Sequence, residues 1–147
     1  MSVQGIDVDK VSRWLVDNID GATAPFVFDL IAGGRSNLTF RVTDARGSRY
    51  VLRRPPLGHV LATAHDMARE HRIIAAVGRT GVPVPRALGL CTDTDVNDAP
   101  FYVMSHVDGE VLDSADKAAL LDPSLREGAS HHLIDVLAEL HAVDVDA

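Results

Sequence analysis

Residues 29–42, DLIAGGRSNLTFRV, place a pair of glycines, Gly33 and Gly34, between two stretches of strand-forming residues. Apolar and polar side chains alternate after the glycines, as is typical of a half-buried strand. Because glycine lacks a Cβ atom, the turn can bring several backbone N–H groups close to a bound anion. The stretch therefore predicts strand, glycine turn and strand, with two readings of the turn: an ordinary hairpin connection or a phosphate site.

The chain on either side of this hairpin predicts a small antiparallel sheet with helices around it. Strand-forming composition or alternation occurs in five segments, residues 26–31, 38–43, 49–54, 86–91 and 101–104. Apolar residues at helical spacing occur in four segments, residues 8–19, 64–78, 112–121 and 130–143. The acidic stretch 92–98 is expected to be a solvated hairpin loop between the last two strands.

Glu70 is placed on the apolar face of the expected helix 64–78. That face consists of Met67, Ile73, Ile74 and Val77, all within about 60° of Glu70 at about 100° per residue. An unpaired carboxylate there would be costly, and Arg53 shares the inward face of the preceding strand with Val51. We therefore predict an ion pair between Arg53 and Glu70, which is either purely structural or part of a site that orients phosphates.

Composition excludes several classes of function. A net charge of −7 and an isoelectric point near 5.3 argue against a nucleic-acid surface, which needs clustered lysine and arginine. The single cysteine, Cys91, cannot form an internal disulfide, and no apolar stretch approaches the roughly 20 residues that span a bilayer. We expect a cytoplasmic soluble protein without nucleic-acid or membrane partners.

Two groups of side chains match the pattern of a metal site only in part. His131 and Asp135 have the spacing of neighbours on a helix, but zinc needs three or four converging ligands. The acidic stretch 92–98 lacks the sixth-position glycine and the final glutamate of a calcium loop. We expect no metal ligands in this chain.

The order of glycine turn, inward basic residue on a strand and inward glutamate on a helix is the order that kinases use to hold phosphates. The accompanying motifs are AGGRSN (32–37), YVLRR (50–54), REHR (69–72), GVPVP (81–85) and FYVM (101–104) continuing to Gly109. Together they resemble the aminoglycoside phosphotransferase family, in the branch found alongside or fused to acyl-CoA dehydrogenases. The resemblance implies an α+β fold: a protein-kinase-like N-lobe over residues 1–107, with a five-stranded antiparallel sheet plus a helix, and the start of a helical C-lobe over residues 108–147.

The resemblance also implies an ATP- or GTP-dependent kinase that phosphorylates a hydroxyl group of a small molecule. The residues that would cover the phosphates are Gly33, Gly34, Arg35, Ser36 and Asn37. Arg53 stands where many members of the wider fold have a lysine that reaches the α- and β-phosphates, and Glu70 would orient it. Arginine keeps the charge but changes the geometry of its donors.

The base of the nucleotide would lie against the end of the last strand. The resemblance implies that Val51 covers the adenine and that Met104 lines the back of the pocket. The carbonyl of Ser105 and the N–H of Val107 would bond to the base, although the same segment also reads as a plain exit from a strand.

The chain contains no His-Gly-Asp loop followed by Asn, and no later metal-binding Asp of the family. These are the base and the Mg²⁺ ligands of phosphoryl transfer. We therefore expect an amino-terminal portion with no catalytic residue of its own, inactive alone, whose Mg²⁺ ligands lie outside it. A non-catalytic kinase-like interaction or regulatory module is the alternative, and aminoglycoside, choline-like, sugar and hydroxyacyl acceptors all stay open.

The expected helix 130–143 carries an apolar stripe of Leu133, Val136, Leu137 and Leu140. The resemblance implies that this stripe packs on a lobe that the sequence does not contain. We therefore expect self-association or altered docking through the stripe.

Overall fold

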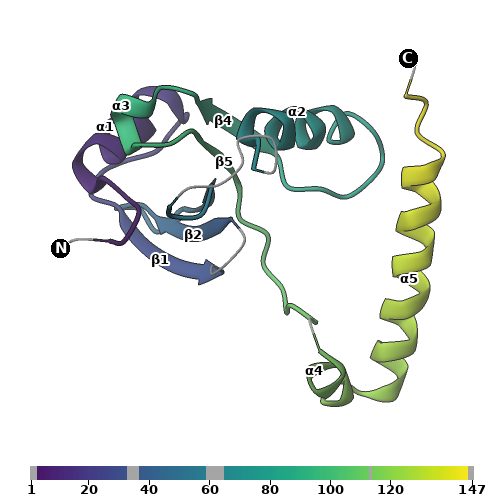
Figure 1. Ribbon diagram of the computed structural model, residues 1–147. Coiled ribbons are helices and arrows are strands. Elements are labelled where there is room, and N and C mark those ends of the chain that lie inside the picture. The colour runs from purple at the N-terminus through teal and green to yellow at the C-terminus, as the bar shows by residue number, and fades with distance from the viewer. Residues whose placement is uncertain (1–2, 33–36, 59–64, 113, 146–147) are drawn as a thin grey trace.

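The computed structural model describes residues 3–32, 37–58, 65–112 and 114–145 (Figure 1). Its centre is a five-stranded antiparallel sheet in the order β1-β2-β3-β5-β4. The strands are β1 (Val27–Ala32), β2 (Leu38–Thr43), β3 (Arg49–Arg54), β4 (Ala87–Cys91) and β5 (Phe101–Ser105). The predicted α+β fold with this sheet is confirmed, and each strand lies within one residue of its expected bounds.

Strand pairing decides which side chains share a face of the sheet. Arg53 on β3 pairs with Thr39 on β2 and with Tyr102 on β5. Two residues earlier on the same face, Val51 pairs with Met104. Because successive side chains alternate between faces, these residues form one surface across three strands.

The opposite face is the hydrophobic core, and α1 (Val8–Asn18) covers it. Val11 and Leu15 of α1 are fully buried in this core. Trp14 packs edge-on against Phe101, with ring centroids 4.9 Å apart. A Cβ atom on Gly89 of β4 would lie 3.0 Å from the Trp14 ring, so glycine is what lets α1 approach the sheet this closely.

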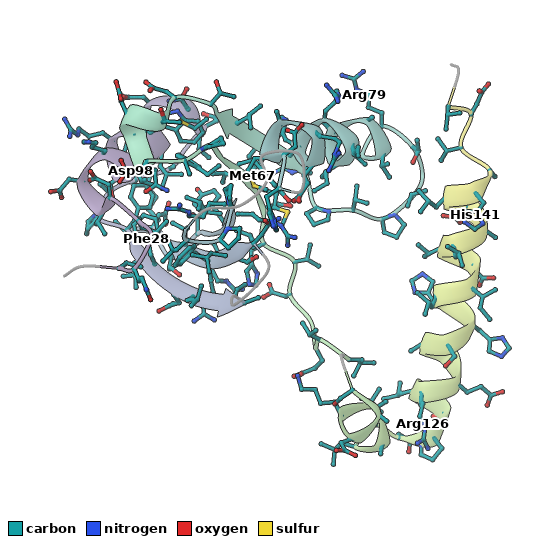
Figure 2. The ribbon with its side chains drawn as sticks, in the orientation of Figure 1. Phe28, Met67, Arg79, Asp98, Arg126 and His141 are labelled. Atoms are coloured by element: carbon teal, nitrogen blue, oxygen red, sulfur yellow. The ribbon has the colours of Figure 1, made fainter. Side chains whose placement is uncertain are left out.

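The face that carries Arg53 lies against α2 (Met67–Val77). Figure 2 labels Met67 where the start of α2 meets the sheet, and its side chain is buried. The helix begins at Met67 because Asp66 is extended and its side chain accepts the N–H of Arg69. The expected start at residue 64 lies outside the described residues.

Ile73 does not belong to the buried face of α2, which corrects the predicted apolar stripe. Its side chain is 54% exposed, whereas Ile74 and Val77 are half-buried. Helical spacing places Ile73 at the margin of the stripe, about 60° from Glu70, and this margin faces solvent.

The acidic stretch between β4 and β5 is not the simple solvated loop that we predicted. It contains one helical turn, α3 (Thr94–Asn97), which Asp93 caps through the N–H of Asp95. Asn97 is buried, and its Oδ1 accepts the N–H of Asp7 at 2.8 Å. The stretch therefore anchors the start of α1, and α1 and α3 lie side by side (Figure 1).

The two adjacent arginines at the end of β3 point to opposite faces. Arg54 is buried, and its guanidinium donates to the carbonyls of Gly5 and Pro55. Burial lowers the pKa of Arg54. Arg54 therefore fixes the chain around the core, whereas Arg53 faces α2.

The C-terminal part is helical, and its bounds differ from those predicted. It contains α4 (Ala115–Ala119) and α5 (Pro123–His141). The longer helix begins at Pro123 and not at residue 130, because Asp122 caps it and proline fits the first turn. No described helix combines the length and the apolar composition needed to cross a membrane.

An apolar face of α5 is uncovered in this structure. In Figure 1 α5 stands away from the sheet, and in Figure 2 Arg126 and His141 mark its two ends. Leu133, Ile134 and Leu137 are 70%, 65% and 48% exposed. Continuous exposed apolar surface of this kind is uncommon on soluble monomers.

We predict that the chain self-associates through this face in solution. Light scattering should give a mass above the 15.8 kDa of one chain. Introducing charge with Leu133→Glu and Leu137→Glu together should restore the single-chain mass, because the apolar area is lost. The paired control, His131→Glu with His132→Glu, should leave the association intact. A monomeric parent chain with α5 ordered would contradict this prediction.

Candidate functional site

The carboxylate of Glu70 on α2 is the centre of a hydrogen-bond network on the sheet. Its Oε2 accepts from Arg53 Nε at 3.0 Å and from the hydroxyl of Tyr102 at 3.1 Å. Its Oε1 accepts from Nδ2 of Asn37 at 2.8 Å. The predicted ion pair between Arg53 and Glu70 is confirmed, and two further donors complete it.

Burial makes these bonds stronger than they would be at the surface. The side chains of Arg53 and Glu70 are 35% and 28% exposed, while Asn37 and Tyr102 are buried. Burial, followed by the negative charge of Glu70, raises the pKa of Tyr102 to about 12. The Tyr102 hydroxyl therefore stays protonated and donates at every physiological pH.

Asn37 is held from both sides. Its Oδ1 lies 2.5 Å from Nδ1 of His65, just before α2. Because the Glu70 carboxylate only accepts, Nδ2 of Asn37 faces Glu70 and Oδ1 faces His65, so that Nδ1 of His65 is the donor in this contact. The network therefore joins the start of β2 to the start of α2.

The outer end of Arg53 has no partner among the described residues. Its Nε is used by Glu70, but neither terminal nitrogen makes a hydrogen bond to any residue that the structure describes. The guanidinium is thus anchored at one edge and presents two N–H₂ groups to a further acceptor. An arginine in this state can bind a planar or tetrahedral oxyanion.

Val51 and Met104 form an apolar surface next to Arg53. Val51 is buried and Met104 is half-buried, directly opposite it on β5. The segment after β5 is fixed at Ser105, whose N–H donates to the carbonyl of Arg86 at 2.9 Å. Val107, two residues on, is 65% exposed, and its N–H has no partner within the described part of the chain.

A salt bridge that sequence analysis did not predict holds this segment against the sheet. Arg49 at the start of β3 bonds to both carboxylate oxygens of Asp108, at 2.8 Å and 2.9 Å. It fixes the path of the chain just beyond Val107.

The predicted glycine turn lies mostly outside the described residues, which do not include Gly33, Gly34, Arg35 and Ser36. Asn37 and the strands on either side of the turn are described. Ala32 pairs with Thr39, and Thr39 in turn pairs with Arg53. The β2 side of the connection is therefore next to Arg53, and the β1 side lies one strand further away.

A hollow of about 680 Å³ includes Arg54, His65, Met67 and Asp98 in its walls. It lies near the end of β3 and the start of α2, whereas Ser105 and Val107 lie at and beyond the end of β5. The hollow therefore borders the Glu70 network at His65, which contacts Asn37, and not at the segment proposed to contact a base. No three His, Cys, Asp or Glu side chains among the described residues come together as a metal site.

The sequence matches the profile of the phosphotransferase enzyme family, of the aminoglycoside phosphotransferase type, over residues 27–147. The chain belongs to this family. A candidate aminoglycoside phosphotransferase from Ralstonia eutropha JMP134, known from its crystal structure, superposes with a TM-score of 0.75 at 28% identity. The superposition covers 95% of this chain and 39% of that one.

Curated relatives bear the names of acyl-CoA dehydrogenases. The chain is 37% identical to the probable acyl-CoA dehydrogenase IBR3 of Arabidopsis thaliana, over 99% of this chain and 18% of that protein. It is 36% identical to acyl-CoA dehydrogenase family member 10 of Mus musculus, over 86% of this chain and 12% of the relative. The human family member 11 is 34% identical over 78% of this chain and 14% of its own length. This phosphotransferase-family chain thus spans less than a fifth of these relatives.

Sequence analysis predicts the ion pair and names Asn37, but as a residue that covers phosphates and not as a donor to Glu70. It gives no role to Tyr102 beyond its strand and none to His65. Alternation along β5 could have placed Tyr102 on the face of Met104, but no local signal relates His65 to Asn37, which lies 28 residues earlier.

We predict that Glu70→Ala lowers the free energy of unfolding by roughly 2–4 kcal/mol, because it leaves the buried donors of Asn37 and Tyr102 without an acceptor. Asp29→Ala is the matched control. It breaks the more exposed Asp29–Arg41 pair and should cost about 1 kcal/mol or less. Chemical denaturation of both variants would measure the difference, and equal losses would mean that the Glu70 network is not desolvated.

The raised pKa of Tyr102 predicts a loss of stability at high pH. The folded chain keeps the Tyr102 proton where the unfolded chain, with a pKa of 10, loses it. The stabilisation is complete below pH 10 and is lost as the pH rises through about 12, amounting to roughly 2–3 kcal/mol. The chain has two tyrosines, so tyrosinate absorbance during a pH titration should show a late step that Tyr102→Phe removes. Both tyrosines ionising in one step near pH 10 would contradict the network.

Proposed function

We propose that this chain supplies the nucleotide-binding part of a phosphotransferase that transfers a phosphoryl group from ATP or GTP to a hydroxyl group of a small molecule. The observation that carries the proposal is the orientation of Arg53. Glu70 holds it at Nε, and its two terminal nitrogens are unused by any described residue. Membership of the phosphotransferase family and the solved relative support the reaction type.

The roles of the other residues follow from their positions around Arg53. Val51 and Met104 offer the apolar surface for the base. The carbonyl of Ser105 and the exposed N–H of Val107 would provide the edge contacts that orient it. Residues 33–37 would contribute backbone N–H groups to the phosphates that Arg53 contacts.

The terminal nitrogens of Arg53 and the N–H of Val107 have no partner among the described residues, and they suit a nucleoside triphosphate. A nucleotide with Mg²⁺ would supply the phosphoryl group and much of the charge that has to be stabilised. Arg53 and residues 33–37 would hold phosphate oxygens, and Glu70 would keep Arg53 in place. The residue that takes the proton of the acceptor and the Mg²⁺ ligands would come from outside these 147 residues.

The proposal extends to the chemical class of the acceptor. Because the curated relatives are named acyl-CoA dehydrogenases, an acyl compound that carries a hydroxyl group is the acceptor that their names favour. We place the reaction in the cytoplasm, where ATP and GTP are available.

Nucleotide binding by the chain tests the proposal. Calorimetric titration with ATP and Mg²⁺ should detect weak binding, because one wall of the site is open to water. Arg53→Ala should weaken ATP binding roughly tenfold or more, through loss of a charge-assisted contact. Arg13→Ala removes the same charge from α1, on the other face of the sheet, and should change little.

Three outcomes would contradict the proposal. Tight ATP binding that survives Arg53→Ala would show that Arg53 does not meet the phosphates. Turnover of ATP by the 147-residue chain alone would show that a base and metal ligands have been overlooked. No binding of any nucleotide would favour an interaction or regulatory module.

A further inference from the structure

We propose that Asn37 and Tyr102 are positioning residues that keep Arg53 from forming a two-bond fork with Glu70, so that both terminal nitrogens of Arg53 stay available for a phosphate. The first half of this inference concerns only the geometry of this chain. The second half, the use of those nitrogens for phosphate, rests on the function proposed above.

Arginine and a carboxylate normally prefer two parallel hydrogen bonds. Elsewhere in this sheet, Arg41 donates to Asp29 from two nitrogens, Nε and Nη2, which share the single oxygen Oδ2 at 3.3 Å and 3.0 Å. Arg53 differs, since only its Nε donates to Glu70. Something in the surroundings of Glu70 must therefore disfavour the second bond.

The other donors to Glu70 supply the reason. Asn37 Nδ2 bonds at 2.8 Å to Oε1, the oxygen that a second arginine nitrogen would need for two parallel bonds. The Tyr102 hydroxyl bonds at 3.1 Å to Oε2, the oxygen that two arginine nitrogens would otherwise share, as they do in the Arg41–Asp29 pair. Both competitors are buried, so releasing Glu70 would leave a buried donor without a partner, which is costly.

His65 contacts the other end of the Asn37 amide. The Glu70 carboxylate only accepts, so Nδ2 of Asn37 faces it, and Oδ1 accepts from Nδ1 of His65 on the other side, which holds the amide in place. Asn37 therefore presents Nδ2 to Glu70.

This arrangement explains how arginine can serve at a position where a lysine would present a single nitrogen. A lysine paired with Glu70 could not be trapped in a fork, whereas an arginine could turn its fork onto the carboxylate and away from the ligand. Asn37 and Tyr102 prevent this turn. Asn37 and Tyr102 thus allow an arginine at position 53 to keep both terminal nitrogens available for a ligand.

The geometric half is tested without any nucleotide. Nitrogen NMR of the Arg53 guanidinium, assigned by its loss in Arg53→Lys, reports rotation about the Cζ–Nε bond. In the parent chain we expect fast rotation, because the terminal nitrogens are unbonded. In Asn37→Leu, which removes the amide but excludes water from its place, Arg53 should fork onto Glu70 and its rotation should slow. Asn18→Leu, at an exposed asparagine of α1, should have no effect.

The phosphate half is tested by comparing ADP with adenosine. In Asn37→Leu, ADP binding should weaken roughly tenfold while adenosine binding stays within about twofold, since only the phosphate contact is lost. In an Arg53→Lys background the same Asn37→Leu change should have less than about a twofold effect on ADP, because lysine has no fork. Tyr102→Phe keeps the buried ring and should act in the same direction more weakly, and it carries both tests if Asn37→Leu does not fold.

The outcomes separate this inference from the proposed function. Unchanged rotation and unchanged ADP affinity in folded Asn37→Leu and Tyr102→Phe would overturn the inference. Equal losses of ADP and adenosine binding would do the same, since they would indicate a merely structural role. A parent chain that binds neither probe would overturn the proposed function, while slowed Arg53 rotation in Asn37→Leu would still support the positioning role.

Discussion

The structure depends on one constraint, a carboxylate on the face of a helix that packs against a sheet. Glu70 cannot lie there unless donors meet it, because an unpaired charge in a partly buried place is strongly unfavourable. Arg53, Tyr102 and Asn37 come from β3, β5 and the start of β2, and all three donate to Glu70. Satisfying Glu70 therefore fixes α2 against three parts of the sheet at once.

Side chains alternate between the two faces of β3, and this gives the two arginines at its end different surroundings. Arg53 and Arg54 are adjacent in sequence and have similar intrinsic chemistry, yet their side chains leave the strand on opposite sides. Arg54 is buried among backbone carbonyls around the core, whereas Arg53 pairs with Glu70 and keeps its outer end open. One basic dipeptide thus provides both a core anchor and the candidate phosphate contact.

Much of the fold could be predicted because its signals are local. Strand-forming composition or alternation predicted all five strands, and spacing placed Glu70 on the inward face of its helix, from which the pair with Arg53 followed. Errors occurred where distant contacts decide. The stretch 92–98 folds into a helical turn in which buried Asn97 bonds to Asp7, 90 residues away. Ile73 lies at the margin of the face of α2 that packs on the sheet, and it is exposed.

The sequence by itself determined the order of elements, the inward glutamate and its arginine partner, because periodicity and burial act within one strand or one helix. Only the tertiary structure decided how that arginine is presented. The contacts of Glu70 with Asn37 and Tyr102 span 33 and 32 residues, and they exist only once β2, β5 and α2 have met. Which nitrogen of Arg53 binds Glu70, and which nitrogens remain open, depends on competition among these donors for two oxygens, and no local pattern encodes that competition.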